Sequence, residues 1–404
     1  MTGLTLEHPH PLRRWFVAIL LVWVALAGLL WGRLAQDAVP YQVAGDLVHD
    51  QPHDVYASPS GDLYDLTPTF AAKWCALAPA GTDCPSVAVA YVSMPLALPF
   101  SVLLAAPGAD LGVALARLVA AGALVAGMLV LWNRLADRSP DAPRYLVITA
   151  LLLTPMASVP IVLGQTSPCL FLLACLGVAR TDRPARRWAV AALWAMTIAL
   201  KVFPAAMGLV LLAQRRLRLI GAALISLVAL GALTLVLAPA SIWSDFVHLS
   251  VRVAQRSTTN PYSGSLDGVA HTIWAPLADN RVLSSALLGL RALVAGGLWW
   301  WGVRDADDDS QWAYGWLALM LVIPLVWWHY LWVAVAALGI VLARPAIDRK
   351  WLVALPVLAA VTVPLSLLAA SSHSSTLGQG AVLVAAAVAV PVIARTARTP
   401  VPQN

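Results

Sequence analysis

The sequence predicts an all-α, polytopic integral membrane protein, and three observations carry this prediction. Hydrophobic residues fill 60% of the 404 positions, charged residues fill 11%, and the mean hydropathy is +0.78. A soluble domain carries about 25% charged residues, so this chain lacks the polar surface that water requires on all sides. The apolar runs show no period of two, which argues against an outer-membrane barrel. We expect a single multi-pass domain over residues 1–404 in a bacterial plasma membrane.

Apolar segments recur along the chain, and runs of about 20 such residues are typical of spanning helices. They lie near 15–35, 86–106, 112–132, 145–163, 167–179, 188–213, 217–238, 286–303, 313–343, 351–369 and 378–394. The segments 188–213 and 313–343 are too long for one simple span, and they contain Pro204 and Pro324. Because proline breaks or kinks a helix, we expect each to form two shorter helices that meet at one membrane face.

Basic loops predict the orientation, because Lys and Arg collect on the cytoplasmic side. The basic stretches are Arg13 and Arg14, 180–187, 215–218, 344–350, and Arg395 with Arg398. The long polar loops 36–85 and 239–285 then face outside. If every apolar segment between the outer loop 36–85 and the basic stretch 180–187 crossed the membrane once, that basic stretch would lie outside. We therefore expect one segment between 86 and 165 to be re-entrant or split, near Pro155 and Pro160.

Several classes of function are disfavoured. The net charge of +6 comes from short loops between apolar runs rather than from a basic tract, so no nucleic-acid partner is expected. No HExxH or CxxC spacing and no GxxxxGK[ST] loop occurs, so we predict neither a metal site nor a cofactor. An enzyme that works outside the cell without cytosolic nucleotide sugars would use a donor carried by a lipid.

The loop 36–85 holds seven aspartates against one lysine. For most of them a solvated acidic loop is sufficient explanation. Asp37 differs, because it follows the first predicted span directly, with Tyr41 four residues later. A carboxylate fixed at a helix end can take a proton from an acceptor hydroxyl, and general-base assistance contributes about 10²–10⁴-fold in rate.

Lys201 interrupts an apolar run and is followed by Pro204. A cation at bilayer depth costs roughly 2.5–3.5 kcal/mol on insertion scales, which favours a functional role. A lipid phosphate or pyrophosphate at the membrane surface would be a suitable partner. The alternative is a lysine whose long stem reaches the interface.

Two further motifs interrupt apolar segments. The Gly164-Gln165 turn places an amide where it could hydrogen-bond sugar hydroxyls, although an ordinary polar turn would look the same. The run Trp327-Trp328-His329-Tyr330 carries rings that can stack on sugars and a histidine that can titrate near neutrality. An interfacial aromatic belt would explain the tryptophans but not the histidine.

The second outer loop and the cysteines leave alternatives open. Residues 260–268 have the composition of turns and include Asp267, and this stretch could hold an acceptor. Cys75 and Cys84 share the first outer loop, where either a disulfide or two unpaired thiols would fit.

These motifs, in this order, resemble the GT-C class of membrane glycosyltransferases, specifically glycosyltransferase family 87. That family includes actinobacterial mannosyltransferases that use polyprenyl-phosphate-mannose, and related arabinofuranosyltransferases. The matching elements are Asp37-Ala-Val-Pro-Tyr41, Tyr91-Val-Ser-Met-Pro95, Gly164-Gln165, Lys201-Val-Phe-Pro204 and Trp327-Trp328-His329-Tyr330. The chain departs from the family at Ala38, where Phe is frequent, and at Val92-Ser93, where Pro-Pro is frequent.

The resemblance implies a GT-C type helical bundle that moves a sugar, mannose first, from a polyprenyl-phosphate donor to a cell-envelope glycolipid or polysaccharide with inversion. The expected roles are catalytic base for Asp37, donor-phosphate binding for Lys201 and His329, and sugar or acceptor binding for Tyr41, Gln165, Tyr91, Trp328 and Asp267. Arabinofuranosyl transfer is the alternative within this class. A lipid-carrier transporter and a non-catalytic partner in envelope assembly are the alternatives outside it.

Overall fold

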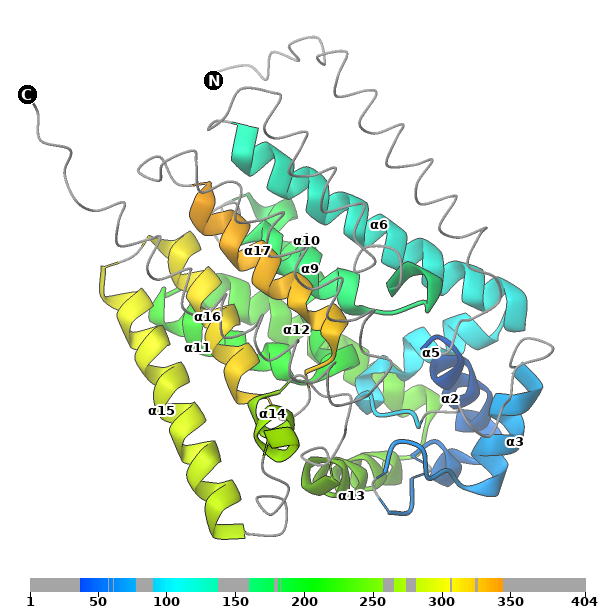
Figure 1. The fold of residues 1–404 in the computed structure, drawn as a ribbon. Helices are drawn as coiled ribbons and strands as arrows, with labels where there is room; N and C mark the ends of the chain where they lie inside the picture. The colour runs from blue at the N-terminus through cyan, green and yellow to red at the C-terminus, as the bar shows by residue number, and fades with distance from the viewer. Residues whose placement is uncertain are drawn as a thin grey trace, which may run out of the picture.

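The computed structural model describes much of the chain, shown in Figure 1. The described residues are 37–56, 58–60, 62–77, 90–136, 160–177, 181, 183–256, 265–273, 281–305, 307–323 and 326–343. Within these ranges the regular elements are α-helices and 3-10 helices, without a β-strand, so the all-α prediction is confirmed. The predicted spans near 15–35, 351–369 and 378–394, and most of the one near 145–163, lie outside the described residues.

The stretch predicted as the first outer loop is largely helical. It contains α2 (Val39–Asp50), the 3-10 helix η1 (Pro52–Asp54) and α3 (Pro68–Leu77). Pro40 stands in the first turn of α2, where its missing N–H costs nothing. Most of α2 is buried, whereas Asp50, Asp62 and Asp65 are exposed. The solvated acidic loop is therefore confirmed for these aspartates but is wrong for α2.

The apolar segment 86–106 does not form a spanning helix. Its described part is the 3-10 helix η2 (Pro95–Ala97) followed by α5 (Leu98–Ala105), which is eight residues long. At 1.5 Å per residue α5 extends about 12 Å, well short of a hydrocarbon core of about 30 Å. The next helix, α6 (Ala109–Ala136), has 28 residues. The short segment 86–106 is one candidate for the re-entrant or split segment expected between 86 and 165. The other, near Pro155, lies outside the described residues.

The long segment 188–213 is split as predicted. The elements of this region are α9 (Ser167–Leu176), α10 (Pro184–Lys201), η3 (Phe203–Ala206), α11 (Met207–Ala213) and α12 (Leu217–Leu237). The break falls at Val202, which has a φ of 29°. The C-terminal ends of α10 and α12 lie side by side, because Met94 N–H donates to Ala199 O at 3.0 Å and Thr234 Oγ1 donates to Pro95 O at 3.0 Å.

The segment 313–343 is also split as predicted. The elements that follow α12 are α13 (Ser241–Arg256), α14 (Leu266–Ile273), α15 (Arg281–Asp305), α16 (Asp308–Val322), η6 (Trp328–Tyr330) and α17 (Leu331–Leu342). The side chain of Asp307 accepts from the backbone N–H of Ser310, which caps the start of α16. All of α17 is buried, since it packs among α6, α9 and α16.

Two apolar clusters hold the helices together. The larger one joins α6, α9, α10, α11, α16 and α17, and it includes the fully buried rings of Trp312, Trp316 and Trp332. The smaller one joins α2, α5 and α13 around Phe70 and Trp74 of the first outer loop. The described part of the predicted first outer loop is thus packed onto the bundle by apolar contacts.

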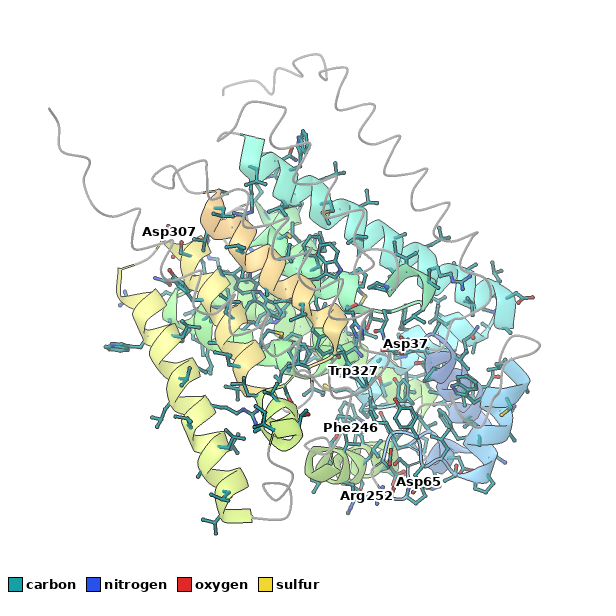
Figure 2. The ribbon with its side chains drawn as sticks, viewed as in Figure 1. Asp37, Asp65, Phe246, Arg252, Asp307 and Trp327 are labelled. Carbon is teal, nitrogen blue, oxygen red and sulfur yellow. The ribbon has the colours of Figure 1, made fainter. Side chains whose placement is uncertain are left out.

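Two ends of the bundle differ in charge. At one, which we call the basic end, Arg134 Nη1 lies 2.6 Å from Asp309 Oδ2 and Arg216 Nη2 lies 2.5 Å from Asp308 Oδ2. These contacts gather the C-terminal end of α6 and the N-terminal ends of α12 and α16. The other end holds the C-terminal end of α10 and the N-terminal ends of α9 and α17. Figure 2 shows Asp307 at the basic end, far from Asp37.

Two described helices are long and apolar enough to cross a membrane, within α6 (Ala109–Leu135) and at α12 (Leu217–Leu237). Shorter apolar helices include Ser285–Trp300 in α15 and Leu331–Leu342 in α17. Large apolar side chains are exposed along α12 and α15, for example Val228 and Leu293. Such surfaces suit contact with lipid tails, which are as apolar as leucine.

Candidate functional site

Asp37 stands in the turn that leads into α2, directly before Ala38. The residue keeps part of its surface accessible, whereas Ala38 and Val39 are fully buried. The buried start of α2 therefore fixes the backbone of Asp37. A carboxylate anchored in this way has little freedom to move away from its neighbours.

The Gly164-Gln165 turn brings its amide to Asp37. Gly164 has a φ of 68°, which glycine adopts without the strain of a side chain, and the N–H of Gln165 donates to Pro160 O at 2.7 Å. The turn is also tied to α6, because Arg117 Nε donates to Val162 O at 3.0 Å. The Gln165 side-chain amide donates a hydrogen bond to the Asp37 carboxylate. The turn thus supplies a polar partner to the predicted base.

Lys201 is the last residue of α10. The helix stops there because Val202 adopts a left-handed φ of 29°, a conformation that is strained for a β-branched residue. The indole of Trp194 secures the bend by donating to Pro204 O at 2.8 Å. The charge of Lys201 interacts with Asp37, Tyr41 and Tyr330.

The third group of side chains at this site comes from η6, which directly precedes α17. The Lys201 ammonium donates a hydrogen bond to the Tyr330 hydroxyl, and its Nζ lies 5.7 Å from the centroid of the Tyr330 ring. His329 is buried, with its ring stacked on Trp327 at 6.3 Å and packed edge-on against Tyr330 at 4.9 Å. His329 also lies within electrostatic reach of Lys201. In Figure 2 the labelled Trp327 and Asp37 both lie near the centre of the molecule.

These residues form one group, the site cluster: Asp37, Tyr41, Gln165, Lys201, His329 and Tyr330. They come from the start of α2, the turn before α9, the end of α10 and the start of α17. Since the basic end gathers the opposite ends of α9 and α16, the site cluster lies at the end of the bundle remote from the arginine pairs.

The surroundings shift the protonation of Asp37. Burial of the carboxyl group raises the pKa of Asp37 above its ordinary value, because a desolvated carboxylate is disfavoured. The Gln165 hydrogen bond and the charge of Lys201 act in the opposite direction and offset part of that rise. Asp37 is thus a stronger base than an exposed aspartate, with partners that keep its ionised form accessible.

The remaining predicted residues are placed less directly. Tyr91 is buried, and its ring packs edge-on against Tyr41 with centroids 5.6 Å apart, so it lies behind Tyr41. Trp328 belongs to η6, and Asp267 to α14. The side chains of Trp328 and Asp267 lie outside the described part of the structure.

Sequence reasoning missed the contributions of Tyr330 and Ser93. Tyr330 ends the motif that drew attention to His329, and only the fold shows that its hydroxyl faces Lys201. Ser93 lies in the segment before η2, and its Oγ donates to Leu200 O at 2.9 Å and lies 3.2 Å from the Tyr41 hydroxyl. Ser93 lies inside the motif Tyr91-Val-Ser-Met-Pro95, but a single serine there gives no signal of either contact.

The cysteines and possible metal ligands complete the description. Cys75 is disulfide-bonded, Cys169 and Cys175 are buried and free, and Cys84 lies outside the described residues. Among the residues that the structure describes, no group of three or more His, Cys, Asp or Glu side chains is arranged to hold a metal ion.

Comparison with known proteins identifies the family of the chain. The model of glycosyltransferase family 87 matches residues 98–324, which is more than half of the chain. Gln165 and Lys201 lie inside the matched range, and Asp37, Tyr41 and His329 lie outside it. No curated protein and no solved structure matches. The chain belongs to glycosyltransferase family 87.

Proposed function

We propose that this membrane glycosyltransferase moves a sugar, mannose first, from a polyprenyl-phosphate donor to a cell-envelope glycolipid or polysaccharide at the extracytoplasmic face. The observation that carries the proposal is the pairing of a carboxylate with a cation in one cluster. Asp37 is held by Gln165, and Lys201 is held by Tyr330. Sugar transfer from a lipid phosphate needs one group that accepts a proton and another that receives negative charge.

Asp37 acts as the general base in this proposal. It takes the proton of the acceptor hydroxyl while that oxygen attacks the anomeric carbon from the face opposite the phosphate. The new carbon–oxygen bond forms as the bond between the anomeric carbon and the phosphate oxygen breaks, so the configuration inverts. The raised pKa of Asp37 suits this role, since a base works best when its pKa approaches the working pH.

Lys201, with His329 beside it, stabilises the negative charge that develops on the departing polyprenyl phosphate. A phosphate leaves without a strong general acid, so a fixed cation is sufficient. Electrostatic stabilisation by such preorganised groups often contributes more to catalysis than any other single effect. It is stronger where water is excluded, and burial of His329 and Tyr330 around Lys201 provides that condition.

Tyr41 and Gln165 orient the sugar or the acceptor in this proposal, because both lie next to the charged pair. Tyr91 supports Tyr41 from behind through its ring contact. The assignments of Trp328 and Asp267 to sugar or acceptor binding stay predictions.

Two observations support an outward-facing site. The site cluster lies at the end of the bundle remote from Arg134 and Arg216, and arginine-rich ends are typical of the cytoplasmic side. Cys75, in the first outer loop, is disulfide-bonded, as expected in an oxidising compartment.

The choice of mannose rests on the sequence resemblance, and an arabinofuranose donor would use the same charged pair. Membership of a glycosyltransferase family argues against the transporter and the non-catalytic partner. Both alternatives predict that Asp37 is dispensable.

The test compares purified wild type with Asp37→Asn and with Asp65→Asn, in which an exposed aspartate is changed instead. Each receives polyprenyl-phosphate-mannose or its arabinofuranose counterpart together with envelope lipids. We expect wild type and Asp65→Asn to transfer one sugar and Asp37→Asn to bind the donor without transfer. Full activity of Asp37→Asn would overturn the assignment of the base, and failure of wild type with both donors would overturn the donor class.

A further inference from the structure

The carbonyl groups at the end of α10 are bound by the segment before η2. The last four C=O groups of a helix lack partners within the helix. Here Met94 N–H donates to Ala199 O at 3.0 Å and Ser93 Oγ donates to Leu200 O at 2.9 Å. Ala199 and Leu200 precede Lys201 directly, so the hydrogen bonds fix the turn of α10 that presents the cation.

Ser93 also links this turn to the acceptor side of the site cluster. Its Oγ lies 3.2 Å from the Tyr41 hydroxyl, and its backbone carbonyl accepts from the Tyr56 hydroxyl at 2.8 Å. Ser93 is buried, with 3% of its surface exposed. One small side chain therefore contacts both the helix end that carries Lys201 and the helix α2 that follows Asp37.

The direction of these hydrogen bonds follows from the number of protons. A serine hydroxyl carries one proton, and a carbonyl oxygen can only accept. The Ser93 proton therefore goes to Leu200 O, and the contact with Tyr41 requires the Tyr41 hydroxyl to donate to Ser93 Oγ. Toward every other neighbour the Tyr41 oxygen is then an acceptor, able to receive a hydrogen bond from Lys201 or from a sugar hydroxyl.

We propose that Ser93 is a positioning residue of the transfer reaction, which fixes the helix end carrying Lys201 and turns the Tyr41 oxygen toward substrate as a hydrogen-bond acceptor. The inference rests on the proposed roles of Lys201 and Tyr41. It adds a residue that touches neither donor nor acceptor.

The test is a double-mutant cycle between Ser93 and Tyr41, with rescue at Ser93. Ser93→Ala removes both hydrogen bonds of the side chain, Ser93→Thr keeps the hydroxyl, and Tyr41→Phe removes the phenolic oxygen. Ser226→Ala is the matched control, since Ser226 Oγ donates to Ala222 O within α12. Each variant is assayed for transfer with polyprenyl-phosphate-mannose, and its unfolding temperature in detergent is compared with wild type.

We expect Ser93→Ala to lower kcat/KM about 3- to 10-fold, the range of one or two neutral hydrogen bonds. The double variant should be no more than about 2-fold worse than the more impaired single variant, because both changes break the same contact. Ser93→Thr should restore most of the activity, and Ser226→Ala should match wild type.

Two outcomes would overturn the inference. One is a multiplicative loss in the double variant, and the other is a Ser93→Thr enzyme as impaired as Ser93→Ala at an unchanged unfolding temperature. A separate assay of Lys201→Met keeps the proposed function apart. If Lys201→Met loses activity while Ser93→Ala does not, only the role of Ser93 fails. If Lys201→Met is fully active, the proposed role of Lys201 fails first.

Discussion

The backbone of Gly164 packs directly against Ala38, so closely that a Cβ added at Gly164 would lie 2.8 Å from Ala38 Cβ. The same Cβ would lie 3.3 Å from Ala116 Cβ on α6. Since Ala38 follows Asp37 and Gly164 precedes Gln165, this backbone approach brings the amide to the carboxylate. The glycine thus has two requirements, a left-handed φ and the absence of a side chain.

We therefore predict that Gly164→Ala reduces sugar transfer about 10-fold or more, because the added methyl group pushes the turn away from Asp37 and a small misplacement of catalytic groups is costly. The matched control is Gly122→Ala, at an exposed position of α6 where a Cβ would meet nothing within 4 Å. The control should keep full activity, and in a helix it should gain about 0.5–1 kcal/mol in stability. Equal activity of the two variants in a transfer assay would contradict the argument.

The acid limb of the pH–rate profile should report Asp37. Because burial raises the pKa of Asp37, kcat/KM should fall with decreasing pH at values above about 3.9, the pKa of an exposed aspartate. Gln165→Leu removes a hydrogen bond to the ionised form, which raises the pKa further and moves the limb to higher pH. A limb that stays in place in Gln165→Leu would show that another group titrates.

Lys201 should affect the chemical step through its charge. We expect Lys201→Met to lower kcat about 10²–10³-fold, the cost of losing one preorganised electrostatic group. Lys201→Arg keeps the charge but not the shape of the hydrogen bond to Tyr330, so partial activity is expected. Steady-state kinetics with the lipid-phosphate donor would separate these outcomes. A variant Lys201→Met whose kcat equals that of wild type would remove Lys201 from the mechanism.

The basic end should matter for stability rather than for chemistry. Arg134 is nearly buried and also donates to the carbonyls of Cys175 and Leu176, so Arg134→Met should cost about 2 kcal/mol, as expected for lost hydrogen bonds of a charged group. Asp308 and Arg216 are more exposed, and Arg216→Met should cost at most about 1 kcal/mol. Thermal unfolding in detergent measures both. The activity per folded molecule should stay near wild type, and a selective loss of kcat would contradict this separation.

Orientation can be tested by labelling single cysteines in intact cells. Asp65→Cys places a thiol on the exposed first outer loop, and Arg218→Cys places one on the exposed surface near the basic end. A membrane-impermeant maleimide should label Asp65→Cys and leave Arg218→Cys unlabelled until the cells are broken. The buried Cys169 and Cys175 should contribute no background, which wild type checks. The reverse pattern would place the site inside the cell.

The sequence predicts the two helix breaks well because a proline or a charge acts on the helix at its own position. Pro204 marks the split that the structure places at Val202, and the interruption at Pro324 corresponds to the gap between α16 and α17. The gathering of Asp37, Gln165, Lys201 and His329 follows from their shared place at ends of apolar segments. That rule needs only the alternation of helix directions.

Contacts between distant segments were beyond prediction. The 8-residue length of α5 depends on how η2 packs on α10 and α12, and hydropathy alone does not contain that information. The burial of α2 was missed because its composition is that of a mixed loop, whereas its partner α5 provides the apolar surface. The roles of Tyr330 and Ser93 appear only once α10 has been placed beside both of their segments.

The complete burial of α17 has a consequence for biogenesis. The ribosome makes this helix after every other described element, and its N-terminal end carries the Tyr330 hydroxyl that holds Lys201. Until α17 enters the space between α6, α9 and α16, the lysine at the end of α10 lacks its contact with Tyr330. If Lys201 acts as proposed, a nascent chain without α17 should not transfer sugar, and activity should appear only once α17 is in place.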